Sequence, residues 1–260
     1  MRKIISLLTA ICFCSVISAQ TTEILQQADS AYTADNFQEA AAAYQHVINT
    51  EGTSAEILYN LGNSYYRMGE LGKSILAYER ALRLDPTFED ARNNLEFVNS
   101  KIADRPGERG SFVGNALDAV ANSAKSNTWA WLAFACFILT LSGVAAYIFS
   151  NLVAVRKAGF FGGIVTLIAC GAFIYLAFRS ASIALADDVA IVTAPSTILS
   201  TSPRIPKDRN QEAMLLHEGT RVQILDSVRS TTDSVNALWY DVQVDNAHRA
   251  WINASAVEKI

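Results

Sequence analysis

Two long uncharged runs most restrict what this chain can fold into. They extend from Trp129 to Phe149 and from Ala158 to Phe178, and neither contains Asp, Glu, Lys or Arg. As α-helices rising about 1.5 Å per residue, each would be roughly 30 Å long, which is the thickness of the hydrocarbon core of a bilayer. A buried hairpin in a soluble core would also be apolar, but runs of this length are typical of membrane spans. We therefore expect two transmembrane helices, at 128–150 and 158–178.

Aromatic and small residues within these runs support the same interpretation. Trp129 and Trp131 lie at one end of the first run, and Tyr147 and Tyr175 lie near ends, as aromatic residues at a membrane interface do. Glycines would let the two helices pack closely. These glycines are Gly143, Gly159, Gly162, Gly163 and Gly171. The sequence thus predicts a transmembrane helical hairpin, with the lipid bilayer as a partner.

The N-terminus has the order of a secretory signal. Arg2 and Lys3 are followed by an apolar stretch and then by Ser18 and Ala19, which provide a small-residue exit. We expect residues 1–19 to be a signal peptide that is cleaved after Ala19. Without cleavage the segment would become an anchor, and the chain that follows it would still cross the membrane.

Composition argues against several classes of function. The formal net charge is −4, which provides no basic surface for nucleic acid. The histidines are scattered, and every cysteine lies in an apolar run, so neither a disulfide framework nor a metal site is expected. These residues are His46, His217 and His248, and Cys12, Cys14, Cys136 and Cys170. With no nucleophile–base arrangement and no phosphate-binding loop, we expect no cofactor and no enzymatic activity.

Residues 55–88 follow a helix–turn–helix pattern. Small residues at Gly62 and Ala81 allow two helices to approach, Tyr65 and Tyr78 fill the space beside them, and a proline ends the second helix. The pattern resembles the tetratricopeptide repeat (TPR), whose period is 34 residues. Ser74 stands where that signature usually has Ala. The matching positions are Leu58, Leu61, Gly62, Tyr65, Gly69, Tyr78, Ala81 and Pro86.

The segments on either side continue the same register. Ala28, Ala40 and Tyr44 lie 34 residues, one repeat length, before three positions of the 55–88 pattern. These positions are Gly62, Ser74 and Tyr78. The sequence therefore predicts a degenerate repeat at 21–54. After residue 88, Leu95 takes a first-helix position and the sequence then becomes polar, as expected of a solvent-facing cap at 89–104. The predicted all-α TPR solenoid therefore covers residues 20–104.

The register also predicts a partner-binding groove, because the first helices of TPR repeats line a concave surface. Asn63 and Asn94 occupy positions where peptide-binding TPRs use asparagine, whose side chain both donates to and accepts from a peptide unit. The lysines of a carboxylate clamp are missing, so a C-terminal carboxylate is not the expected ligand. The alternative is that these are simply solvated helix positions. The candidate residues are Tyr59, Asn60, Asn63, Tyr66, Arg67 and Asn94, with Leu25, Asp29, Tyr32, Asn93 and Phe97 also facing the groove.

Residues 105–127 connect this region to the first apolar run. Within them, Phe112, Ala116, Leu117 and Val120 share one side of a short amphipathic helix. Two interpretations remain open: a helix lying at the membrane surface, or an ordinary linker helix.

The last segment, 187–260, has a β-rich sequence. Apolar and polar residues alternate from Tyr240 to Val244, and turn-forming residues separate several short apolar stretches. Gly219 before "RVQIL", Trp239-Tyr240, and Trp251-Ile252 resemble a bacterial SH3-like (SH3b) barrel, with 202–210 as a polar loop. We expect an all-β barrel whose Trp239 and Tyr240 belong to its core.

Charge and export together predict the topology. The connection at 151–157 contains Arg156 and Lys157 and no acid, which favours the cytoplasmic side. A secretory signal would export the N-terminal region, and this gives the same orientation. Lys125 and Arg179 flank the other ends and weaken the charge bias. We expect both water-soluble regions on the periplasmic side of a bacterial inner membrane.

This multidomain order, an exported TPR region, two spans and an SH3-like domain, resembles the BatE family of the Bacteroides aerotolerance operon. The resemblance implies a non-catalytic scaffold of the Gram-negative envelope that acts in aerotolerance or stress. Its implied partners are von Willebrand factor A-domain Bat proteins and, indirectly, a MoxR-type ATPase. The alternative function is a receptor that binds peptidoglycan through the SH3b-like domain. A transporter subunit is disfavoured because neither predicted span contains an ionisable residue.

Overall fold

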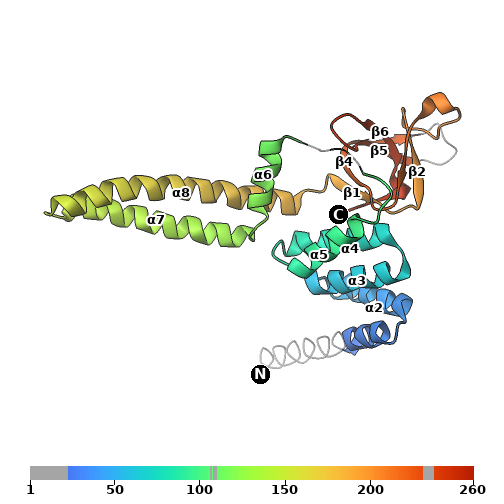
Figure 1. The fold of residues 1–260 in the computed structure, drawn as a ribbon, viewed down its shortest axis with the longest axis horizontal. Helices are drawn as coiled ribbons and strands as arrows, with labels where there is room; N and C mark the ends of the chain where they lie inside the picture. The colour runs from blue at the N-terminus through green and yellow to red at the C-terminus, as the bar shows by residue number, and fades with distance from the viewer. Residues whose placement is uncertain (1–22, 106, 108–109, 231–236) are drawn as a thin grey trace, which may run out of the picture. The chain divides into compact units, whose positions relative to one another are not determined.

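The computed structural model describes residues 23–105, 107, 110–230 and 237–260. The predicted signal peptide at 1–19 lies outside these residues. The chain divides into two compact units. One combines the N-terminal helices with the C-terminal sheet region that begins at Asp187, and the other contains the two apolar helices and the short helix that precedes them (Figure 1).

The N-terminal helices form pairs with the spacing that the sequence predicted. Residues 23–33 are helical and precede α2 (Phe37–Thr50), and the next pair is α3 (Ala55–Met68) and α4 (Leu71–Leu84), followed by α5 (Glu89–Asn99). Both turns between paired helices contain a residue of positive φ, Asp35 at 61° and Gly69 at 81°. Because these residues are one repeat length apart, the two turns are equivalent.

The repeat core explains the small residues of the pattern. Tyr44 and Tyr78 are buried at equivalent positions of α2 and α4. A Cβ on Gly62 would lie 2.6 Å from Cε1 of Tyr78, so only glycine allows this approach of α3 to α4. The departure at Ser74 also has a structural reason, because its buried hydroxyl donates to the carbonyl of Gly62 at 2.9 Å.

The C-terminal region is one antiparallel sheet in the order β3-β2-β6-β5-β4-β1-β7. Its strands curve around one core, to which the strands from β1 to β7 all contribute buried side chains. Trp239 is buried and Tyr240 packs against this core, as expected. Among the described strands, β3 and β7 end the order, so a closed barrel is not shown. The bounds are β1 Val189–Val192, β2 Ser196–Ser200, β3 Glu212–His217, β4 Arg221–Ser230, β5 Ala237–Gln243, β6 Arg249–Asn253 and β7 Val257–Lys259.

The β1–β7 end of the sheet packs against α4. Ile191 of β1 is fully buried in a cluster with Ile75 and Val98 of the helices. Two arginines of α4 bind backbone carbonyls at the end of β7: Arg80 donates to Lys259 at 2.5 Å, and Arg83 donates to Ile260 at 2.7 Å. A further repeat would pack its second helix beside α4, and here the sheet covers α4 instead.

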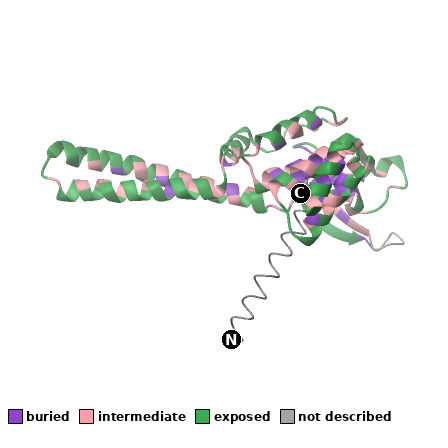
Figure 2. Cartoon of the chain, turned by 90° about the horizontal axis from the view of Figure 1, so that it is seen from below, coloured by how far each residue is buried: buried purple, intermediate pink, exposed green. Residues whose placement is uncertain are grey.

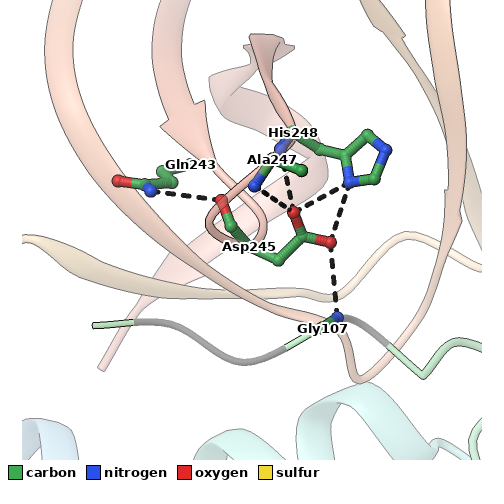
Figure 3. A network of polar contacts seen from close by, with 5 residues as sticks. All are labelled: Gly107, Gln243, Asp245, Ala247 and His248. Atoms are coloured by element: carbon green, nitrogen blue, oxygen red, sulfur yellow. Dashed lines mark hydrogen bonds and ion pairs between the residues drawn. The ribbon is translucent and has the colours of Figure 1, made fainter. Parts of the chain in front are cut away.

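The segment after α5 is attached to the same sheet by two carboxylates. Asp104 accepts from the backbone N–H of His217 at 2.6 Å and from the Thr220 hydroxyl at 2.7 Å. Asp245, in the turn after β5, accepts from the backbone N–H of Gly107 at 3.3 Å, and Nδ1 of His248 lies 2.8 Å from both of its oxygens (Figure 3). The connection therefore forms part of the contact between helices and sheet.

The second unit consists of α6 (Phe112–Ala121), α7 (Ser126–Phe149) and α8 (Val153–Leu185). The last two are long and apolar enough to cross a membrane, and most of their side chains are exposed (Figure 2). Helix α8 begins at Val153, before Arg156 and Lys157, so these two residues lie near its N-terminus rather than in a loop, and only 150–152 separate the helices. The helix also continues past the predicted span end at 178.

Small and hydroxyl side chains join α7 to α8. A Cβ on Gly143 would lie 2.8 Å from the carbonyl oxygen of Gly159, and a Cβ on Gly159 would lie 2.6 Å from that of Gly143. The hydroxyls of Thr140 and Thr166 hydrogen-bond across the pair at 2.8 Å. Close approach at small residues is the packing typical of membrane helices.

Candidate partner-binding surface

Two helices, α3 and α5, present most of the predicted groove residues. Tyr59, Asn63 and Tyr66 lie four and then three residues apart on α3, and this spacing places them on one side of the helix. Asn94 and Phe97 of α5 lie beside them. Apolar side chains on the other sides of both helices are buried, so packing of the repeat core determines which side is left exposed.

Three of the six candidates form a single hydrogen-bonded network. The Oδ1 atom of Asn63 accepts from the hydroxyl of Tyr78 at 2.6 Å and from Nδ2 of Asn94 at 2.9 Å. Asn94 also donates to the hydroxyl of Tyr59 at 3.3 Å. Because Asn63 Oδ1 already accepts two hydrogen bonds, the group that Asn63 offers a ligand is its Nδ2 donor, and Asn94 offers its carbonyl acceptor.

The first repeat contains an equivalent arrangement. The hydroxyl of Tyr44 donates to Oδ1 of Asp29 at 2.5 Å, and Asn60 lies within hydrogen-bonding reach of the same hydroxyl. Burial raises the pKa of Tyr44, and the hydrogen bond and charge of Asp29 raise it further. Burial likewise raises the pKa of Tyr78 to about 12. Both phenols therefore stay protonated at neutral pH and remain donors to the groove side chains.

Aromatic side chains extend the surface beyond this network. The rings of Tyr66 and Phe97 meet edge to face with centroids 5.8 Å apart, and Phe97 is 52% exposed. The Nζ atom of Lys101 lies 4.5 Å from the Phe97 ring centroid. An aromatic pair with one exposed ring, next to a cation, suits an apolar side chain with an acidic neighbour.

Arg67 is not part of this cluster. Its Nη2 atom lies 3.0 Å from Oδ1 of Asp35, and its guanidinium lies 4.2 Å from the centroid of the Phe37 ring. Both contacts are to the turn and second helix of the first repeat. Because the ion pair is exposed, it contributes little to stability, so Arg67 remains able to exchange partners.

A groove of about 500 Å³, which was not predicted from the sequence, lies between α2, α3 and α4. Leu58, Leu61 and Ala77 contribute to its lining, and basic side chains of α4 stand at its rim. These cations have partners: Lys73 pairs with Glu70 at 2.7 Å, and Arg80 lies 3.7 Å from Glu258. The spacing of Lys73, Arg80 and Arg83 along one helix is the sequence pattern that could have indicated this groove.

Within the described part of the chain, no three His, Cys, Asp or Glu side chains group into a metal site. The arrangement on α3 and α5 offers hydrogen bonds and aromatic contacts, which are the means of binding a peptide segment.

Comparison with known proteins identifies one part of the chain. The family model of the tetratricopeptide repeat matches residues 55–88, the bounds that the sequence analysis gave for the second repeat. A search of curated proteins finds no match. Residues 55–88 therefore form a tetratricopeptide repeat, which indicates that this region takes part in protein–protein interaction.

Proposed function

We propose that this protein is a non-catalytic, membrane-anchored scaffold that holds an extended segment of a partner protein on the surface formed by α3 and α5. The observation that carries the proposal is the joined group of Tyr59, Asn63 and Asn94 beside the half-buried Tyr66 and the exposed Phe97. Asn60 and Arg67 belong to the same proposed surface, toward the first repeat.

The network suits recognition of a peptide backbone. The hydroxyl of Tyr78 and the amide of Asn94 fix the side chain of Asn63 before any ligand arrives. Fixed donors and acceptors lose less entropy on binding than mobile ones, so more of the interaction energy contributes to affinity. The neighbouring aromatic pair then provides the apolar contact that such interfaces use as an anchor.

In this proposal α7 and α8 cross the bacterial inner membrane. Arg156 and Lys157 at the start of α8 favour a cytoplasmic position for the short connection, with residues 151–157. The TPR region and the C-terminal sheet region then share the periplasmic side, which agrees with the predicted export of the N-terminus. Contacts such as Ile191 with Ile75 support the proposal that these two regions are on the same side.

The resemblance to the BatE family provides the partners. Von Willebrand factor A-domain Bat proteins in the same membrane would supply the segment bound on α3 and α5. A MoxR-type ATPase of the cytoplasm would connect through those proteins, because residues 150–152 between α7 and α8 are too few to form a docking domain.

Site-specific photocrosslinking in intact membranes tests this function. A photoreactive side chain at Phe97 should yield a reproducible crosslinked membrane protein, and one at Gln45, in the groove between α2 and α4, should not. The variant Phe97→Ser should weaken recovery of that partner at least several-fold, because the exposed ring is a main apolar contact.

Two outcomes would contradict it. Crosslinks from position 45 alone would show that the partner binds in the groove between α2, α3 and α4, and not on the surface of α3 and α5. Cosedimentation of the full chain with peptidoglycan sacculi, unchanged by Phe97→Ser and accompanied by no crosslinked protein, would support the peptidoglycan receptor instead.

A further inference from the structure

Helix α6 turns its apolar side chains away from the helices on which it packs. Ala121 is fully buried and Asp118 contacts α8, whereas Phe112 is 85% exposed. The other large apolar residues of this helix, Val113, Leu117 and Val120, are exposed as well. A surface helix of a soluble domain normally directs such residues at the core. In α6 the side chains directed at the neighbouring helices are instead small or polar.

Polar contacts hold α6 in this orientation. Arg179 of α8 donates to both carboxylate oxygens of Asp118, from Nε at 2.6 Å and from Nη2 at 2.9 Å. Such a bidentate pair fixes direction as well as distance. The indole Nε1–H of Trp129, in the first turn of α7, donates to the carbonyl of Ala121 at 3.0 Å. The two contacts fix α6 at one end of the α7–α8 pair.

Helix α6 lies across α8 rather than along it (Figure 1). It crosses α8 at the level of Trp129 and Arg179, which border the uncharged stretches of α7 and α8. If α7 and α8 run through a bilayer, a helix that crosses them at this level lies in the plane of the membrane surface.

We propose that α6 is an interfacial helix whose face of Phe112, Val113, Leu117 and Val120 inserts at the boundary between lipid headgroups and acyl chains. The inference rests on the proposed function, in which α7 and α8 span the membrane. We assign this face to lipid because it continues the exposed apolar surface of α7 and α8. The acyl chains that surround these two helices would then cover the α6 face as well. The Asp118–Arg179 pair neutralises two charges at the level where they would otherwise oppose insertion.

Fluorescence quenching in proteoliposomes tests the position of this face. The full chain, with its native cysteines replaced by serine, would be reconstituted in phosphatidylcholine and phosphatidylglycerol vesicles and labelled with an environment-sensitive dye at Leu117→Cys. Asn115→Cys, on the opposite side of α6, is the matched control, and Ile168→Cys, on the exposed surface of α8, reports on the span itself. Spin-labelled lipid should quench the dye at positions 117 and 168, and aqueous iodide should quench it at 115.

The remaining outcomes distinguish the interfacial position of α6 from the spanning of the membrane by α7 and α8. Quenching by iodide at 117 with lipid quenching at 168 would overturn the interfacial position and leave the spans intact. Protection of 117 from both quenchers would show that protein covers the face, which also overturns the proposal. Absence of lipid quenching at 168 would contradict the spanning helices, and with them the anchor of the proposed scaffold.

Discussion

The carboxamide of Asn63 connects the core of the repeat to its surface. Its oxygen accepts from a buried phenol, Tyr78, and from the partly exposed Asn94. Replacing it with alanine would therefore affect folding as well as binding, because a buried hydroxyl loses its acceptor. Binding experiments are better based on Phe97, which is half exposed and has no polar role in the core.

Asn63→Ala should destabilise the helical repeat by about 1–3 kcal/mol, the usual effect of leaving a buried polar group without its partner. Hydrogen exchange of the full chain should show faster exchange in peptides from α3 and α4. Asn93→Ala, at an exposed position of α5, is the control and should change exchange little. Equal protection in the two variants would mean that the Tyr78 hydroxyl finds another acceptor.

At the scale of elements, the α7–α8 pair depends on two glycines that face each other. Gly159→Val should force the helices apart, because even a Cβ at this position lies 2.6 Å from a backbone oxygen. Overpacking of this kind costs about 1–3 kcal/mol, which should lower the melting temperature in detergent by several degrees. At Gly162 a Cβ meets no atom within 4 Å, so Gly162→Val is the matched control. Similar melting of both variants would contradict the close packing.

Some elements were predictable because their signal is local. The apolar runs and the 34-residue register of small and aromatic residues gave the helix pairs, and the family match confirms the repeat at 55–88. Strand β3 was not predicted, because its sequence EAMLLH has no β-branched residue and favours a helix. Its pairing with β2, for example Leu215 opposite Ile198, overrides that preference.

At the scale of the first unit, Asp104 joins the end of the TPR region to the sheet. Burial alone would raise the pKa of Asp104, but hydrogen bonds from Thr220 and His217 outweigh it and hold this pKa below its ordinary value. Its contribution to stability is therefore complete above the pKa of the unfolded chain, about 4, and is lost as pH falls through the lower folded value.

Asp104→Asn should consequently melt at a lower temperature than the unchanged protein at pH 7, and the difference should shrink as pH falls from about 5 to 3. Calorimetry of the full chain in detergent across this range measures it. A difference that stays constant with pH would show that the ionised carboxylate does not hold the sheet on the helices. Asp90→Asn, at an exposed position of α5, is the control for a general change in charge.

The sequence by itself determined the two long apolar helices, the second TPR repeat and the β-rich nature of residues 187–260, because hydrophobic periodicity and the placing of small residues are local properties. Only the tertiary structure decided three other features. Asn63 and Asn94 bind each other, the β1–β7 end of the sheet covers α4, and α6 exposes its apolar side next to α8. Each depends on contacts between residues far apart in the chain, and no local pattern specifies which distant groups will meet.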